Sequence, residues 1–325
     1  MVTVPTELAN AIDVSDTRAK LDAVAKKLIK HRIILAEILK ECVEEFEGYD
    51  VKYIENNCFA GEVQVNEISV DQDVLDADST IIGSDTEDNS NNEGLVRYDL
   101  VFDALVPKTT KAIRLVINIE IQVDTKTPYS LVTRGVYYVA RLISRQKGTV
   151  FDHSNYDKIQ KVYSIWICPS PKGDNVNSIA EYGLKQTKTF GRVDEPIENY
   201  DKMKIIIISL NDKGIEGDNS IIRLLSTLLS TTETVENRKQ ILENEFSIPM
   251  TKEIEEEVTE MCNLGMAVEL KGIAIGREQE KEQLSLEHIR NLMESTKWSA
   301  QQVMDAMKIP KSEQAHYTSI LDSKK

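Results

Sequence analysis

The sequence predicts an α/β fold, with a mixed sheet flanked by helices, followed by an all-α C-terminal region. Strand-like segments, which alternate or are apolar throughout, are interrupted by one stretch with helical spacing. After about Lys213 the strand patterns end and only helical patterns follow. Because a helical crossover joins parallel neighbours, we expect the sheet to contain some parallel pairing.

The N-terminal part is predicted to be helical. Apolar residues recur at helical spacing from about Thr17 to Phe46, and Ser15 or Asp16 can cap the start. Residues 1–16 are expected to form a tail. A short alternating segment, GEVQVNEISV, follows, and the Asp-, Asn-, Ser- and Gly-rich stretch VDQDVLDADSTIIGSDTEDNSNNEGL is typical of a loop.

Four segments have the pattern of core strands: VRYDLVFDALV, AIRLVINIEIQV, KVYSIWIC and KMKIIIISL. Between the second and third, TPYSLVTRGVYYVARLISRQKG has helical spacing and ends at Gly148, a suitable C-cap. Further helices are predicted in IIRLLSTLLS, NRKQILENEF, TKEIEEEVTEMCNLGMAVEL and 277–294. A linker-like stretch, LNDKGIEGD, predicts an α/β domain over 17–212 and a helical region over 213–325.

The net charge of −15 arises from one segment. Residues 41–96 hold sixteen acidic residues and one basic residue, whereas the remainder holds 38 of each. Overall acidity disfavours nonspecific nucleic-acid binding, but acidity this localised does not exclude a DNA partner. Residues 126–161 hold seven basic and two acidic residues, a balance that suits contacts to phosphates. A solvated basic helix face is the alternative.

Several other classes of protein are disfavoured. No run approaches the about 18 apolar residues of a membrane-spanning helix, and the N-terminus lacks the pattern of a signal peptide. A cytoplasmic protein without a membrane partner is therefore expected. The four cysteines have no CxxC spacing and the four histidines are isolated, so no structural zinc site, disulfide framework or catalytic triad is expected.

Near the C-terminus, SAQQVMDAMKIPKSEQAHYTSIL predicts two short helices around a turn. Such a pair is either a helix-turn-helix DNA reader or a packing or dimerisation element. DNA-cutting enzymes often act as dimers, so a homo-oligomer is also considered.

The segments RYDLVFDAL and INIEIQ place two carboxylates on neighbouring predicted strands. In the second strand Asn118, Glu120 and Gln122 face one side, and isoleucines face the other. A carboxylate among isoleucines is costly to desolvate unless it is paired, and a hairpin could bring it close to Asp99. Two hard oxygen ligands suit Mg²⁺ or Mn²⁺. Spacing alone leaves open that both acids instead pair with nearby arginines.

Seven segments, in order along most of the chain, resemble the Rpn family of recombination-promoting nucleases and transposase-like proteins, which belongs to the PD-(D/E)XK superfamily. They are HRIILAEILKECVEEF, EGLVRYDLVFDAL, LVINIEIQV, TRGVYYVARLISRQKG, YDKIQKVYSIWICP, SIPMTKEIEEEVTEMCNLG and TKWSAQQVMDAMKIP. The resemblance implies a PD-(D/E)XK (restriction-endonuclease-like) core. It also implies metal-dependent hydrolysis of DNA phosphodiester bonds, with a link to recombination or mobile elements.

The resemblance also implies particular site residues. The metal ligands would be Asp99 of RYD, with Asp103 as a substitute, Glu120 of IEIQ, and the backbone carbonyl of Ile121. The catalytic acid expected on the first helix matches Glu44 or Glu45. The helix after the motif would bring basic residues to the DNA: Arg134, Arg141, Arg145 and Lys147.

One position departs from the family pattern, because the motif lysine is Gln122 here. An ammonium can stabilise negative charge and help to activate water, whereas a neutral amide only orients water. Some superfamily members resemble this chain in having Gln there. Two hypotheses follow. The chain is a nuclease in which Gln122 positions the nucleophile, or it is a catalytically inactive nuclease-fold protein that binds DNA or another protein.

Overall fold

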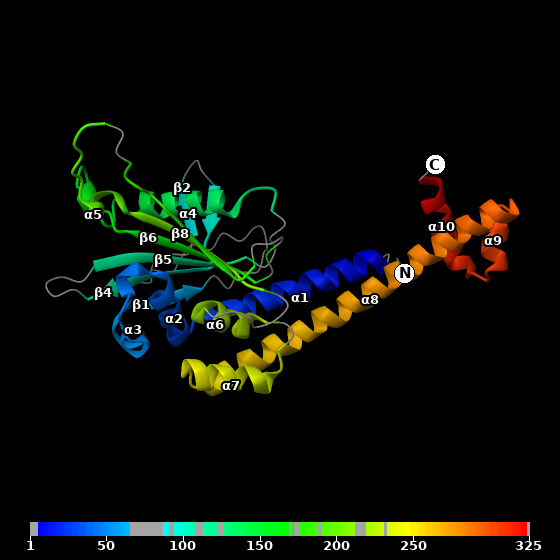
Figure 1. The fold of residues 1–325 in the computed structure, drawn as a ribbon, viewed down its shortest axis with the longest axis horizontal. Helices are drawn as coiled ribbons and strands as arrows, with labels where there is room; N and C mark the ends of the chain where they lie inside the picture. Colours follow the sequence, from blue (N-terminus) through cyan, green and yellow to red (C-terminus); the bar gives the residue numbers. More distant parts are fainter. Residues whose placement is uncertain are drawn as a thin grey trace. The chain divides into compact units, whose positions relative to one another are not determined.

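A mixed six-stranded sheet with helices on both faces forms the core of the protein (Figure 1). The computed structural model describes residues 6–65, 87–90, 94–107, 113–122, 127–169, 171, 176–187, 190–211, 219–230 and 233–323. The predicted α/β class is confirmed. The chain divides into two compact units, Met1–Met266 and Ala267–Lys325.

The sheet has the strand order β1-β4-β5-β6-β8-β7. Its strands are β1 (Phe59–Val65), β4 (Leu100–Val106), β5 (Ile113–Ile121), β6 (Val162–Cys168), β7 (Ser178–Gly183) and β8 (Met203–Ser209). Strands β1, β4 and β5 are antiparallel neighbours, whereas β6 runs parallel to β5 and β8 runs parallel to β6. β2 (Glu87–Ser90) and β3 (Gly94–Arg97) pair separately; β2 lies within the stretch expected to be a loop, and β3 spans the junction of that stretch with the first predicted strand.

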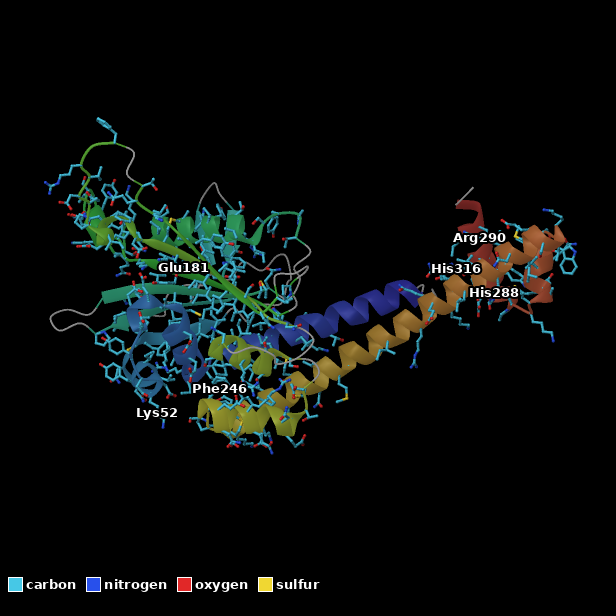
Figure 2. All side chains as sticks on the ribbon, in the orientation of Figure 1. Lys52, Glu181, Phe246, His288, Arg290 and His316 are labelled. Atoms are coloured by element: carbon cyan, nitrogen blue, oxygen red, sulfur yellow. The ribbon has the colours of Figure 1, made fainter. Side chains whose placement is uncertain are left out.

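The central strands are apolar for a physical reason. β6, VYSIWIC, is buried at every position, as expected for a parallel strand covered on both faces. β7, SIAEYG, was not predicted, because its short and weakly apolar sequence gives little strand signal. It stands at the end of the strand order, paired with β8, and Glu181, labelled in Figure 2, lies on it.

One face of the sheet carries α4 (Leu131–Arg145), and the other carries α1, α2, α3 and α6 (Figure 1). Under α4 lies a cluster that includes Tyr138, Val139, Leu142 and Trp166. The other helices of the first unit are α1 (Thr6–Ile29), α2 (Arg32–Cys42), η1 (Glu44–Phe46), α3 (Val51–Asn57), η2 (Tyr156–Lys158), α5 (Ile197–Tyr200), α6 (Ser220–Leu229) and α7 (Val235–Phe246).

The N-terminal helix differs from the prediction in two ways. It begins at Thr6, within the expected tail, and it breaks at Lys30 and His31 instead of continuing to Phe46. His31 has an extended backbone, with φ −61° and ψ 128°. The break lets α2 turn into the core, where residues 33–39 are buried on all sides, whereas α1 keeps partly exposed positions.

The C-terminal helices are α8 (Lys252–Thr296), α9 (Ala300–Ala306) and α10 (Lys311–Ser323). α8 is continuous through KGIAIG, where two separate helices were expected. The predicted domain boundary at 212–213 lies inside the first unit, which also contains α6 and α7.

The second unit has a small core of its own, formed by Leu286, Ile289, Val303, Met304 and Tyr317. His316 of α10, labelled in Figure 2, forms a hydrogen bond with Glu282 of α8. Over the residues that the structure describes, no helix is long and apolar enough to cross a membrane.

Candidate active site

Asp99 and Glu120 are brought together at one end of the sheet. The register pairs Leu100 with Ile119, so Asp99, just before β4, lies beside Glu120 near the end of β5. The backbone N–H of Asp99 donates to Glu120 Oε1 at 3.2 Å. The N–H of Ile121 donates to Asp99 Oδ2 at 2.9 Å. Asp99 and Glu120 therefore lie side by side, as the predicted strand pair would place them.

Glu120 is only 4% exposed, although it carries a carboxylate. Burial, and then the negative charge of Asp99, raise the pKa of Glu120 well above its usual value. The hydrogen bond from the Asp99 backbone and the cations Arg134 and Lys26 offset this rise only in part. Among the described residues, Glu120 Oε2 has no hydrogen-bond partner. A nearby cation or a proton would offset the cost of the charge on this buried residue.

Two residues of α1 complete the group. Lys26 Nζ lies 2.8 Å from Asp99 Oδ1 and 2.6 Å from Asp22 Oδ2. Burial alone would lower the pKa of Lys26, but the charge of Asp99 and the bond to Asp22 raise it above its usual value. Burial raises the pKa of Asp22. Neither residue was predicted from the sequence, because an i,i+4 Asp–Lys pair is equally typical of a solvated helix face.

Gln122 lies directly after β5, and its side chain is held by α4. Arg134 Nη1 donates to Gln122 Oε1 at 3.1 Å, and Nη2 donates to the Tyr138 hydroxyl at 2.6 Å. The guanidinium also lies over the rings of Tyr138, at 4.9 Å, and Trp166, at 5.1 Å. These contacts hold the Gln122 amide in place. They also engage the guanidinium of Arg134, which was expected to bind DNA.

Glu44 and Glu45 belong to a different group of charges. Both pair with Lys161, Glu45 at 2.9 Å, and Asp201 lies 2.5 Å from the same ammonium. The Tyr163 hydroxyl donates to Glu45 Oε2 at 2.6 Å. Burial alone would lower the pKa of Lys161, but its bonds to Asp201, Glu44 and Glu45 raise it to about 12.

This second group lies far from the candidate site along the sheet. Lys161 precedes β6, whereas Glu120 is paired with Trp166 near the other end of that strand. Five residues of strand span about 16 Å. The structure therefore does not bring Glu44 or Glu45 to Glu120, in contrast to the expectation. The acidic residue that α1 places there is Asp22.

Asp103, the expected substitute for Asp99, is also placed elsewhere. It faces Val116 across the strand pair, four residues from Glu120 along β5, and pairs with Arg114 at 2.9 Å. Arg114 therefore pairs with Asp103, whereas the ion-pair partner of Asp99 among the described residues is Lys26.

The basic residues expected to bind DNA differ in exposure. Arg141 is 6% exposed, so it presents little of its guanidinium to a phosphate. Arg145 is half-buried. Burial raises the pKa of Asp103 above its usual value, and the charges of Arg114 and Arg145 offset this rise only in part. Lys147 is exposed after the end of α4. Of Arg141, Arg145 and Lys147, only Lys147 is exposed.

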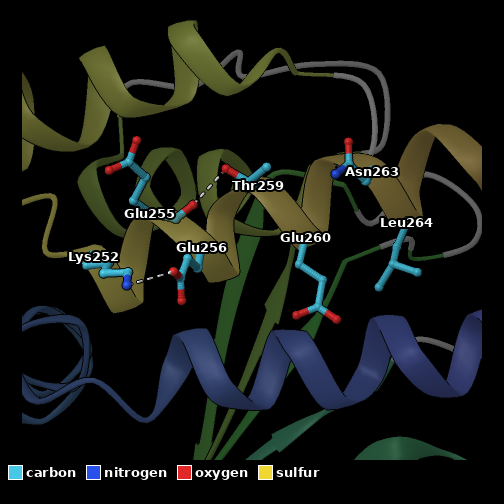
Figure 3. A pocket seen from close by; sticks show the side chains of 7 residues that line it. All are labelled: Lys252, Glu255, Glu256, Thr259, Glu260, Asn263 and Leu264. Carbon is cyan, nitrogen blue, oxygen red and sulfur yellow. Dashed lines mark hydrogen bonds and ion pairs between the residues drawn. The ribbon is translucent and has the colours of Figure 1, made fainter.

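A shallow groove of about 660 Å³ follows the first turns of α8 (Figure 3). Its lining residues are Lys252, Glu255, Glu256, Thr259, Glu260, Asn263 and Leu264. Lys252 lies 3.8 Å from Glu256, and the Thr259 hydroxyl donates to the backbone carbonyl of Glu255 at 2.7 Å. None of the predicted site residues lines this groove.

The chain matches no family model, no curated protein and no solved structure. Its chemistry is therefore inferred from the residues themselves. Asp99, just before β4, and Glu120, near the end of β5, supply hard oxygen donors at one end of the sheet. This donor set fits Mg²⁺ or Mn²⁺.

Proposed function

We propose that this chain is a Mg²⁺- or Mn²⁺-dependent DNA endonuclease of the Rpn type, with a PD-(D/E)XK core. The observation that supports the proposal most strongly is the juxtaposition of Asp99 and Glu120, joined through the Asp99 backbone N–H at 3.2 Å. Strand ends hold both groups in place, as a preorganised catalytic site requires. The mixed sheet flanked by helices agrees with the resemblance on which the family assignment is based.

The residues at this site have distinct proposed roles. Asp99, Glu120 and the carbonyl of Ile121 would hold the ion, which supplies Lewis acidity toward the phosphate and lowers the pKa of a bound water. Gln122, whose amide is oriented by Arg134, positions the attacking water through hydrogen bonding. Exposed basic groups such as Lys147 contact the DNA backbone without reading the sequence.

Lys26 supplies the ammonium that the motif lacks at Gln122. It comes from α1 and not from β5, yet its Nζ lies 2.8 Å from Asp99 Oδ1. A cation this close to the carboxylates can stabilise negative charge that develops on a phosphate. The departure at Gln122 therefore does not leave the site without a cationic side chain.

A catalytically inactive nuclease-fold protein that binds DNA or another protein is the second candidate. The observation that favours it is the same ion pair, because Lys26 neutralises Asp99 without a metal ion. In that case Asp22, Lys26 and Asp99 are a structural charge network, and α1 is fastened to the sheet by it.

A plasmid-nicking assay separates the two candidates. The purified full-length chain is incubated with supercoiled plasmid in Mg²⁺, Mn²⁺ and EDTA, alongside Glu120→Gln. The nuclease proposal predicts nicking in both metals, none in EDTA, and a loss of at least about 100-fold in the variant. Absence of metal-dependent nicking, with DNA affinity equal in both proteins, would instead support the binding protein.

A further inference from the structure

A second group of potential metal ligands lies where the start of α8 meets the turn between α1 and α2. One ligand atom each from His31, Glu253 and Glu257 lies within 4.8 Å of the other two. His31 Nε2 is 2.7 Å from Glu257 Oε2. All three residues belong to the first compact unit. Sequence patterns do not indicate this group, because His31 is more than 220 positions from its partners.

The three residues are held by well-formed elements. Glu253 and Glu257 are four positions apart in the first turns of α8, so their side chains share one face. His31 occupies the N-cap position of α2 but makes no side-chain capping bond, and its ring is directed to Glu257 instead. Glu257 is 8% exposed, which makes an uncompensated charge there costly.

The charge of the group favours a cation. Among the described residues, Glu257 has His31 as its ion-pair partner and Glu253 has none. Neighbouring acids of α8 do have lysine partners: Glu255 pairs with Lys239 and Glu256 with Lys252. With a neutral imidazole, the form that binds metals, the group carries two negative charges.

We propose that His31, Glu253 and Glu257 bind one divalent transition-metal ion, and that the ion ties the start of α8 to the turn between α1 and α2. One imidazole and two carboxylates suit Zn²⁺, Mn²⁺ or Co²⁺, whereas Mg²⁺ prefers oxygen ligands alone. Adjacent ligand atoms of such an ion lie about 3 Å apart when each bond is about 2.1 Å. The 2.7 Å spacing of His31 Nε2 and Glu257 Oε2 is close to this value.

The proposed metal site does not depend on the nuclease proposal, and the following experiment can fail without any consequence for nuclease activity. Tag-free full-length protein is titrated with Zn²⁺ by calorimetry, in a Glu120→Gln background that removes a ligand of the candidate active site. We expect one Zn²⁺ per chain, bound more tightly than Mg²⁺. We also expect a higher Tm with Zn²⁺, because a ligand that binds only the folded state stabilises it.

Three further variants locate the ion. Glu253→Gln and Glu257→Gln should each weaken Zn²⁺ binding at least about tenfold. Glu256→Gln, on the same helix and paired with Lys252, is the matched control and should leave the affinity within about twofold. Glu253 is exposed, so its substitution tests binding without disturbing the core.

The proposal is overturned if Zn²⁺ binds no more tightly than Mg²⁺, or if Glu253→Gln and Glu257→Gln bind Zn²⁺ as the parent does. It is also overturned if Glu256→Gln weakens binding as much as they do, because that result indicates a general effect of negative charge. Loss of nicking activity has no bearing on any of these outcomes.

Discussion

Replacement of Glu120 by Gln should stabilise the metal-free protein. Gln has nearly the same shape, and its carbonyl can still accept the hydrogen bond from the Asp99 backbone N–H. The substitution removes a buried charge whose pKa is raised, first by burial and second by Asp99. At a site built mainly for stability, by contrast, loss of a carboxylate should destabilise the fold.

The magnitude follows from the charges around the site. Two like unit charges about 5 Å apart repel by about 3 kcal/mol at an effective dielectric constant near 20. Attraction of Glu120 to Arg134 and Lys26 offsets part of this repulsion. We therefore expect the free energy of unfolding to rise by about 1–2 kcal/mol in EDTA at neutral pH.

The pH dependence of this gain has a definite sign. The pKa of Glu120 in the folded protein is raised above 4.5, the pKa of an unperturbed glutamate. In the wild type, the loss of stability caused by the Glu120 charge is therefore absent below about pH 4.5. It grows as the pH rises from there to the folded pKa, and it is complete above that pKa. The gain in the Gln variant should disappear as the pH falls toward 4.5.

Urea denaturation of both proteins from pH 4 to pH 8, with EDTA, measures this difference. Addition of Mg²⁺ should raise the stability of the wild type but not that of the variant. A variant that is less stable than the wild type at neutral pH, or that gains as much stability from Mg²⁺, would show that the Glu120 charge does not destabilise the metal-free protein.

Three further substitutions have defined outcomes. Lys161→Met should lower the free energy of unfolding by about 3–5 kcal/mol, measured in urea at pH 7, because it leaves three carboxylates around a buried position without their cation. Gly135→Ala should lower it by about 1–3 kcal/mol, because the added Cβ would lie 2.7 Å from a side-chain carbon of Ile205; equal stability would show that this contact relaxes freely. Lys26→Gln should reduce plasmid nicking by at least about tenfold and leave DNA affinity, measured by fluorescence anisotropy, within about twofold, since its partner is Asp99 and not an exposed surface.

The sequence predicted the strand pair that carries Asp99 and Glu120, because alternation and a turn specify a hairpin and its register. It also predicted the faces of β5, where Asn118 donates to Ser164 at 3.0 Å and Glu120 shares that face. These features depend only on strands that are adjacent in the sequence, and the alternation of apolar and polar residues is enough to predict such strands.

The contributions of distant helices could not be predicted in the same way. Lys26 and Asp22 look like ordinary members of a polar helix face until α1 is placed against the sheet. Glu44 and Glu45 were expected at the site because the family resemblance implies an acidic residue on the first helix, yet both pair with Lys161 instead.

The continuity of α8 is a further example. Two glycines within six residues cost about 1 kcal/mol each relative to alanine, and they favoured a break. The helix nevertheless continues from Lys252 to Thr296. Propensity is a weak prior, and neighbouring turns with good helix formers outweigh it here.

We propose that Asp99 and Glu120 form a metal-dependent catalytic pair. The most direct test compares the rate of Mg²⁺-dependent plasmid nicking by Asp99→Asn with that of Asp103→Asn. Both variants lose one carboxylate near β4, but Asp103 pairs with Arg114 away from Glu120. We predict a loss of at least about 100-fold for Asp99→Asn and a change within about threefold for Asp103→Asn. Equal rates in the two variants, or nicking by Asp99→Asn at the wild-type rate, would show that Asp99 is not part of such a catalytic pair.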